Sequence, residues 1–68
     1  MKKMTVIKIE TVEIQGIKLV NVYFQSNRIV ATSRAQSEDQ YQIGQSFSGR
    51  LSYDAANKRV FSPIYKAA

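Results

Sequence analysis

The sequence predicts a small all-β protein, a barrel built from five short and strongly coiled strands. The first observation is the stretch of residues 5–24, in which two apolar-rich runs, TVIKIETVEI and IKLVNVYF, flank the dipeptide Gln15-Gly16. Gly16 can supply the positive φ that a tight turn requires, so the two runs are predicted to form a hairpin. The second observation is that the apolar residues change phase along each run, and the third is that further short apolar runs follow, separated by turn residues.

With Gln15 and Gly16 as the loop, four facing pairs of the hairpin are apolar on both sides: Ile14 faces Ile17, Val12 faces Leu19, Ile9 faces Val22 and Ile7 faces Phe24. Side chains alternate between the two faces of a strand. Ile7 and Ile9 stand in one phase, whereas Val12 and Ile14 stand in the other. We therefore expect the hairpin to bury one face near its turn and the other near its open end, as a coiled strand pair in a small barrel does.

The remaining chain divides into short elements. Residues 1–4 are expected to be a frayed start, and Ser26-Asn27 is a candidate two-residue turn because asparagine tolerates positive φ. Four strands are expected at residues 5–14, 17–25, 28–35 and 45–53. After a turn at 54–57, residues 58–62 are expected to begin the fifth strand.

Residues 37–43 are interpreted either as one short helix or as a polar loop. Ser37 could cap the helix, with Gln40 three residues on, and Gly44 would end it. In both interpretations Tyr41 and Ile43 are expected to anchor the segment to the core.

Two residues predict irregularities in the later strands. Gly49 in mid-strand indicates a bulge or a sharp bend, and Pro63 cannot donate to a ladder, so that part of its strand lies at an edge or leaves the sheet. Among the aromatic residues, Phe47 and Phe61 are expected in the core, whereas Tyr53 and Tyr65 fit either the core or the surface.

The order of a three-stranded meander, a short helix or loop, and a hairpin resembles a minimal OB-fold, the five-stranded, partly open barrel. The resemblance covers most of the chain and rests on element order. An SH3-like barrel is the alternative, because it also uses five short, bent strands. The aromatic signature of RRM domains and the glycine-rich loop of KH domains are missing from the sequence.

The length and composition of the chain exclude several classes of function. The 68 residues predict one domain over 1–68 whose stability is marginal, because a chain this short buries roughly 60% of its unfolded surface, and a homodimer could compensate. There is no cysteine and no histidine, which removes thiolate metal sites, disulfides and the commonest general base. Glu10 and Glu13 point to opposite faces of an extended strand and cannot pair as acid and base. We therefore expect no enzyme, no cofactor and no metal site.

Ten lysines and arginines against five acids give a net charge of +5. This surplus fits either an ordinary solvated surface or a polyanionic partner. No apolar signal region follows Met1, because Lys8 and Glu10 interrupt it, and no run approaches the length of a membrane span. The expected location is cytoplasmic, without a membrane partner.

The turn at Ser26-Asn27 would place Phe24 opposite Ile29 and Val22 opposite Ala31 on the core side. The opposite face then collects the candidate nucleic-acid-binding residues Lys8, Tyr23, Arg28 and Arg34, together with Asn21, Gln25, Val30 and Thr32. A base can stack on an exposed tyrosine while cations hold phosphates, and OB-folds bind their ligands on this strand 2–3 face. The other interpretation of this face is a solvated surface with one half-covered tyrosine.

Lys58 and Arg59, at the tip of the last hairpin, complete the candidate set, although charged tips also serve simply to keep an edge soluble. Two functions follow. The leading one is a small basic protein that binds single-stranded DNA or RNA without sequence preference. The alternative is a protein-binding module, such as a phage or mobile-element inhibitor or adaptor, that extends a partner's sheet through an exposed strand edge.

Overall fold

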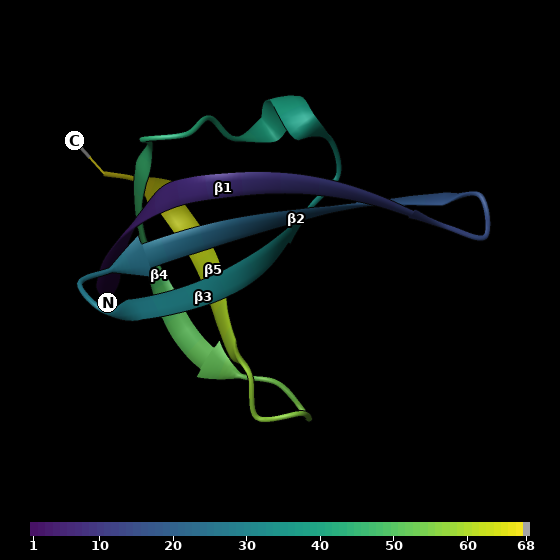
Figure 1. Cartoon of the computed structure of the whole chain (residues 1–68). Coiled ribbons are helices and arrows are strands. Elements are labelled where there is room, and N and C mark those ends of the chain that lie inside the picture. Colours follow the sequence, from purple (N-terminus) through teal and green to yellow (C-terminus); the bar gives the residue numbers. More distant parts are fainter. Residues whose placement is uncertain (68) are drawn as a thin grey trace.

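The computed structural model describes residues 1–67, which form five strands and one 3₁₀ turn. Figure 1 shows their arrangement. The elements are β1 (Lys2–Ile14), β2 (Ile17–Ser26), β3 (Ile29–Ala35), η1 (Glu38–Gln40), β4 (Ser46–Tyr53) and β5 (Arg59–Lys66). All strands belong to one sheet in the order β1-β2-β3-β5-β4, and β4 pairs back to β1 so that the sheet closes into a ring. The predicted all-β, barrel-like class with at most one short helix is confirmed.

The first hairpin has the predicted two-residue loop, with Gln15 at φ 52° and Gly16 at φ 78°. The pairs Ile14–Ile17, Val12–Leu19 and Ile9–Val22 are confirmed. The fourth pair is wrong, because the register shifts between Val6 and Lys8 and it is Val6 that faces Phe24. Ile7 is the bulged residue and is 42% exposed, so it is not part of the core.

The bulge also explains why the predicted burial near the turn is wrong. It brings Val6 into phase with Ile9, so one face of β1 serves the core on both sides of the bulge. The apolar pairs near the turn fall on the other face, where Ile14 is 53% and Ile17 62% exposed. Residues 11–19 form a two-stranded arm that projects beyond the ring (Figure 1). The radius of gyration is accordingly 11.8 Å, against about 11 Å for a compact chain of this length.

The expected frayed start is also wrong. Strand β1 begins at Lys2, and its residues 2–5 pair with β4 from Gly49 back to Ser46. Met4 lies opposite Phe47 and is fully buried. Met4 shares the core face of β1 with the fully buried Val6, so the start of the chain contributes to the core.

The second turn lies one residue later than predicted. Ser26 still pairs with Ile29, and the loop is Asn27-Arg28, with Asn27 at φ 55°. Arg28 is therefore a turn residue rather than the first residue of β3. Phe24 consequently faces Ala31 rather than Ile29, and Val22 faces Ser33 rather than Ala31. Because each partner moves by two residues, the faces of β2 and β3 stay as predicted.

The segment after β3 contains only the short 3₁₀ turn η1, which ends at Gln40 rather than at Gly44. Ser37 makes no side-chain cap hydrogen bond, and instead the Gln36 backbone N–H donates to Gln40 Oε1 at 2.9 Å. Tyr41 is buried as predicted, but Ile43 is exposed, so only the tyrosine anchors the segment.

Strands β4 and β5 show both predicted irregularities. The register shifts between Ser48 and Gly49, and Gly49 lies opposite Pro63. A Cβ at Gly49 would collide with the Ser62 carbonyl oxygen and lie 2.8 Å from Pro63 Cα, so glycine permits the close approach of the two strands. Strand β5 continues past Pro63 to Lys66, which makes it longer than expected. It touches β3 through one parallel pair, Thr32–Val60.

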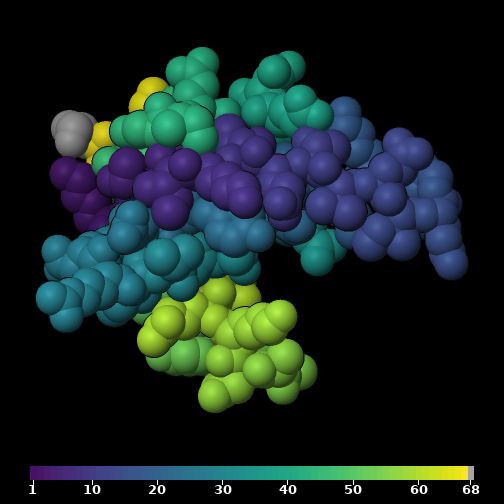
Figure 2. All heavy atoms as spheres, in the orientation of Figure 1, coloured from purple at the N-terminus to yellow at the C-terminus, as the bar shows by residue number. Residues whose placement is uncertain are grey.

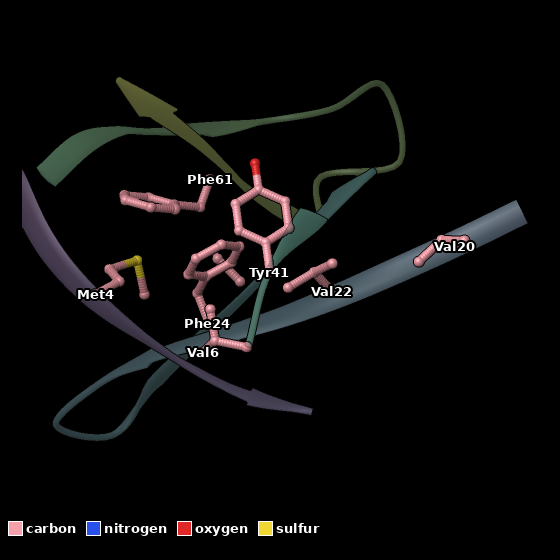
Figure 3. Close-up of a cluster of buried hydrophobic side chains, with 8 residues drawn as sticks. Met4, Val6, Val20, Val22, Phe24, Tyr41 and Phe61 are labelled. Carbon is pink, nitrogen blue, oxygen red and sulfur yellow. The ribbon is translucent and has the colours of Figure 1, made fainter. Parts of the chain in front are cut away.

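The core lies inside the ring and centres on Phe24 (Figure 3). Its ring centroid lies 4.8 Å from that of Phe61, 5.7 Å from that of Tyr41 and 6.1 Å from that of Phe47. The two phenylalanines expected in the core are there, Phe61 fully and Phe47 partly buried. The remaining buried residues are Met4, Val6, Val20, Val22 and Ala31.

Candidate nucleic-acid interface

The outer face of β1, β2 and β3, which points away from the core, carries rows of facing side chains. The central rows are Lys8–Tyr23–Thr32 and Glu10–Asn21–Arg34, and the pair Gln25–Val30 lies beyond them towards the second turn. Three of the predicted site residues, Lys8, Tyr23 and Arg34, therefore share this face. Glu10 is absent from the predicted site residues, and its carboxylate adds a negative charge to this face.

Tyr23 lies at the centre of this face and is half-buried. The Lys8 ammonium nitrogen is 5.3 Å from the centroid of its ring, which is cation–π distance. Glu10 contacts both residues: its Oε2 lies 3.6 Å from Lys8 Nζ, and its Oε1 accepts a hydrogen bond of 3.4 Å from the Tyr23 hydroxyl. The carboxylate thus holds the lysine beside the ring and offsets its charge.

The predicted ring of three cations around Tyr23 is only partly formed. Arg34 faces Asn21, one row along from Tyr23, and is exposed. Arg28 lies in the turn between β2 and β3, beyond the last facing pair, so it flanks this face instead of lying within it. Neither arginine has a carboxylate within 4.0 Å among residues 1–67, so both keep their full hydrogen-bonding capacity.

The tip of the β4–β5 hairpin carries the other two predicted residues. Lys58 is exposed in the loop, and Arg59 begins β5 opposite Tyr53. Tyr53 is 60% exposed and Tyr65 57%, so both undecided tyrosines are surface residues. Asp54 organises the loop, because its Oδ1 accepts hydrogen bonds from the backbone N–H groups of Ala56 and Lys58, each at 2.9 Å.

A cleft of about 260 Å³ lies where the meander meets this hairpin. It is lined by Asn21, Thr32, Ser33, Arg34, Asp54 and Val60. Figure 2 shows the hairpin end as a separate lobe, divided from the projecting arm by a hollow in the surface. The cleft therefore opens between the outer face of β2 and β3 and the hairpin tip, the two places where the sequence predicts ligand contacts.

The arm extends the outer face with apolar side chains. The pairs Val12–Leu19 and Ile14–Ile17 follow Glu10–Asn21 on the same face. The opposite face of the arm is polar and tied to η1: Glu38 Oε1 accepts a hydrogen bond of 2.8 Å from the Thr11 hydroxyl and lies 3.2 Å from Lys18 Nζ. The hydrogen bond from Thr11 and the contact with Lys18 lower the pKa of Glu38 below its usual value.

Two residues of the site are absent from the set predicted from sequence. Glu10 follows Lys8 by two positions, so strand alternation alone places both on one face. Asp54 has no comparable signal. The sequence indicates a turn there, but the approach of that turn to Asn21 and Arg34 depends on ring closure.

Among residues 1–67, no three acidic, histidine or cysteine side chains gather to hold a metal ion. Over the same residues, no helix has the length and apolar character needed to span a bilayer. Comparison with known proteins finds no matching family model, no matching curated protein and no matching solved structure.

Proposed function

We propose that this chain is a small OB-type protein that binds single-stranded nucleic acid on the outer face of β1, β2 and β3. The observation that carries the proposal is the Tyr23 ring, half-buried on that face with Lys8 against it and Arg34 in the next row. A partly covered ring can stack a base, while the cations around it contact the rest of the strand.

The topology supports the OB assignment. Strands β1, β2 and β3 form a meander and β4 returns to lie beside β1, which is the 4-1-2-3 order of a Greek key. Only Thr32–Val60 joins β3 to β5, so the ring is nearly open there. A five-stranded, partly open Greek-key barrel is the OB description, and such folds bind ligands on strands 2 and 3 and on the loops β1–β2 and β4–β5. An SH3-like barrel stays the alternative.

The energies of the competing contacts favour stacking. In the free protein the Lys8 ammonium occupies the ring, a cation–π contact worth about 0.5–1 kcal/mol at an exposed site. A stacked base contributes about 1–3 kcal/mol. A base that displaces the ammonium from the ring therefore gains more than the protein loses, and the released Lys8 can contact a phosphate. The proposal assigns binding and no catalytic step, and it keeps the cytoplasmic location expected from the sequence.

A titration of a labelled nine-nucleotide single strand, and of its duplex, across a salt series tests the proposal. Arg28, Lys58 and Arg59 have no ion pair among residues 1–67, and Lys8, once released from the Tyr23 ring, is the fourth cation that can contact a phosphate. Four phosphate contacts give a slope of log K against log salt of about −3 for a single strand. We expect a Kd of about 10⁻⁶–10⁻⁴ M at physiological salt and weaker binding of the duplex, whose bases cannot stack on Tyr23. No binding of the single strand at low salt would overturn the proposal.

Three variants assign the binding to this face. Arg34→Ala should weaken binding. Arg50→Ala is its matched control, because Arg50 is an exposed β4 residue on the opposite part of the ring. Glu10→Gln should strengthen binding, since it removes the negative charge beside Lys8 and Tyr23. Equal effects of Arg34→Ala and Arg50→Ala would place the contact elsewhere.

The arm favours one other function, a protein-binding module. Both edges of its ribbon lack a strand neighbour among residues 1–67, and the exposed Ile14 and Ile17 stand at its tip. An edge of this kind can extend the sheet of a partner protein. This function becomes the leading one if the oligonucleotide titration gives no binding.

A further inference from the structure

The cleft between the meander and the β4–β5 hairpin has the size and chemistry of a site for one nucleobase. Its volume of about 260 Å³ is below the roughly 300–1,000 Å³ of pockets that enclose a whole ligand, so it fits a fragment of one. Asn21, Thr32, Ser33, Arg34 and Asp54 supply polar groups, and Val60 supplies an apolar wall. An aromatic ring with a polar edge suits this combination.

Arg34 and Asp54 decide what the cleft accepts. They line the same space but form no ion pair within 4.0 Å, so neither satisfies the other. The guanidinium offers only hydrogen-bond donors and the carboxylate only acceptors. A fixed carboxylate repels phosphate, so the nucleic-acid backbone is disfavoured at this point. The occupant must instead present a donor to Asp54 and acceptors to Arg34.

The number of free hydrogen-bond acceptors on Asp54 restricts the possible occupant further. Its Oδ1 already accepts two backbone N–H groups, from Ala56 and Lys58, which use the two lone pairs of that oxygen. Oδ2 makes no hydrogen bond within residues 1–67 and remains as one free acceptor. These two backbone bonds also hold the carboxylate in position before any ligand arrives.

One free acceptor and one forked pair of donors are complementary to the pairing edge of cytosine. We infer that this cleft reads a cytosine base, whose exocyclic N4 amino group donates to Asp54 Oδ2 while its N3 and O2 accept from Arg34. A carboxylate that accepts from cytosine N4 is an established mode of base recognition. Thymine and uracil present an oxygen in place of the amino group, and that oxygen would face the carboxylate. Guanine presents two adjacent donors on its pairing edge, whereas only Oδ2 is free, and adenine presents one acceptor beside its amino group where the forked guanidinium can use two.

This inference rests on the proposed function and adds one discriminating position to a contact that is otherwise independent of sequence. The test compares the single strands (dC)₉ and (dT)₉ by fluorescence anisotropy at low salt. Wild-type protein should bind (dC)₉ at least about fivefold more tightly, the lower end of the discrimination of one good side chain–base pair. If neither strand binds, the proposed function fails. If both bind equally, or (dT)₉ binds better, the cytosine site alone is overturned.

Asp54→Asn tests the assigned residue without disturbing the loop. The asparagine carbonyl oxygen can still accept from Ala56 and Lys58, but an amino group replaces the free acceptor. The preference for (dC)₉ should fall to about one, while the melting temperature stays near that of the parent. Asp39→Asn removes the same charge from η1 and should retain the preference. A preference that survives Asp54→Asn would overturn the inference.

Discussion

Tyr23 and Phe24 are adjacent in the chain but lie in opposite environments. Phe24 is fully buried and contacts three other aromatic rings, whereas Tyr23 lies on the outer face between Lys8 and Thr32. Strand alternation requires this separation, because neighbouring residues cannot share a face. The two positions therefore distinguish a residue that holds the fold from one that contacts a ligand.

We expect Phe24→Ala to cost about 3–5 kcal/mol, which a marginal domain of this size does not survive, and the milder Phe24→Leu keeps the measurement possible. Tyr23→Ala should leave the melting temperature almost unchanged and weaken oligonucleotide binding by about 1–3 kcal/mol. Thermal denaturation and anisotropy on the same samples measure both effects. The separation would be wrong if Tyr23→Ala unfolded the protein or if it bound the oligonucleotide like the parent.

Hydrogen-bond capacity at single residues is the part of the site that sequence patterns describe least well. Alternation correctly places Lys8, Tyr23 and Arg34 on one face. It does not show that Glu10 occupies both Lys8 and the Tyr23 hydroxyl, because this depends on side-chain distances. It also does not bring Asp54 near Arg34, since these residues approach only when the hairpin closes the ring.

At the scale of elements, the five predicted strands are present and the faces of β2 and β3 are correct, whereas the register of β1, its core face and some strand ends are wrong. The apolar pattern of β1 is compatible with a phase change at several positions, and the bulge at Ile7 directly follows the residues that pair with β4. That pairing joins residues about forty positions apart, and local alternation carries no information about it. The second turn is shifted by only one residue, because asparagine can occupy either position of a two-residue loop.

Gly49 provides a prediction at the same scale. Gly49→Ala places a methyl group against the Ser62 carbonyl and Pro63, so the bulge must open or β5 must move away from β4. We expect a loss of about 1–3 kcal/mol in the free energy of unfolding, the usual cost of overpacking. Denaturant unfolding measures this loss, and Ser48→Ala, one residue earlier, is the control. A Gly49→Ala protein as stable as the parent would show that the two strands are not so closely packed.

At the scale of the whole molecule, the arm is notable because it projects beyond the ring and lies outside the core. Its exposed Ile14 and Ile17 form an apolar surface that a second copy of the chain could cover. A few side chains on one ribbon fall well short of the approximately 800 Å² per partner of a standard stable interface. The homodimer predicted from the small core would therefore be weak.

We expect the mass measured by light scattering to approach that of a monomer on dilution and to rise at high concentration. Ile17→Lys should remove the rise, because it places a charge at the centre of the apolar tip. Lys18→Ala, on the opposite face of the arm, should leave the association intact. A mass that is independent of concentration in the parent protein would contradict self-association through the arm.

The pair Thr32–Val60, the only pair between β3 and β5, has a consequence for motion. The β4–β5 hairpin is held by its ladder to β1 on one side and by this one pair on the other. Segments with few hydrogen bonds open at a lower free-energy cost than the whole domain. We therefore expect the ring to open first between β3 and β5, along this seam. In that opening the β4–β5 hairpin would move about the β1–β4 ladder while β1, β2 and β3 stay paired. Because Thr32 and Val60 both line the cleft, a ligand seated there would hold the seam shut.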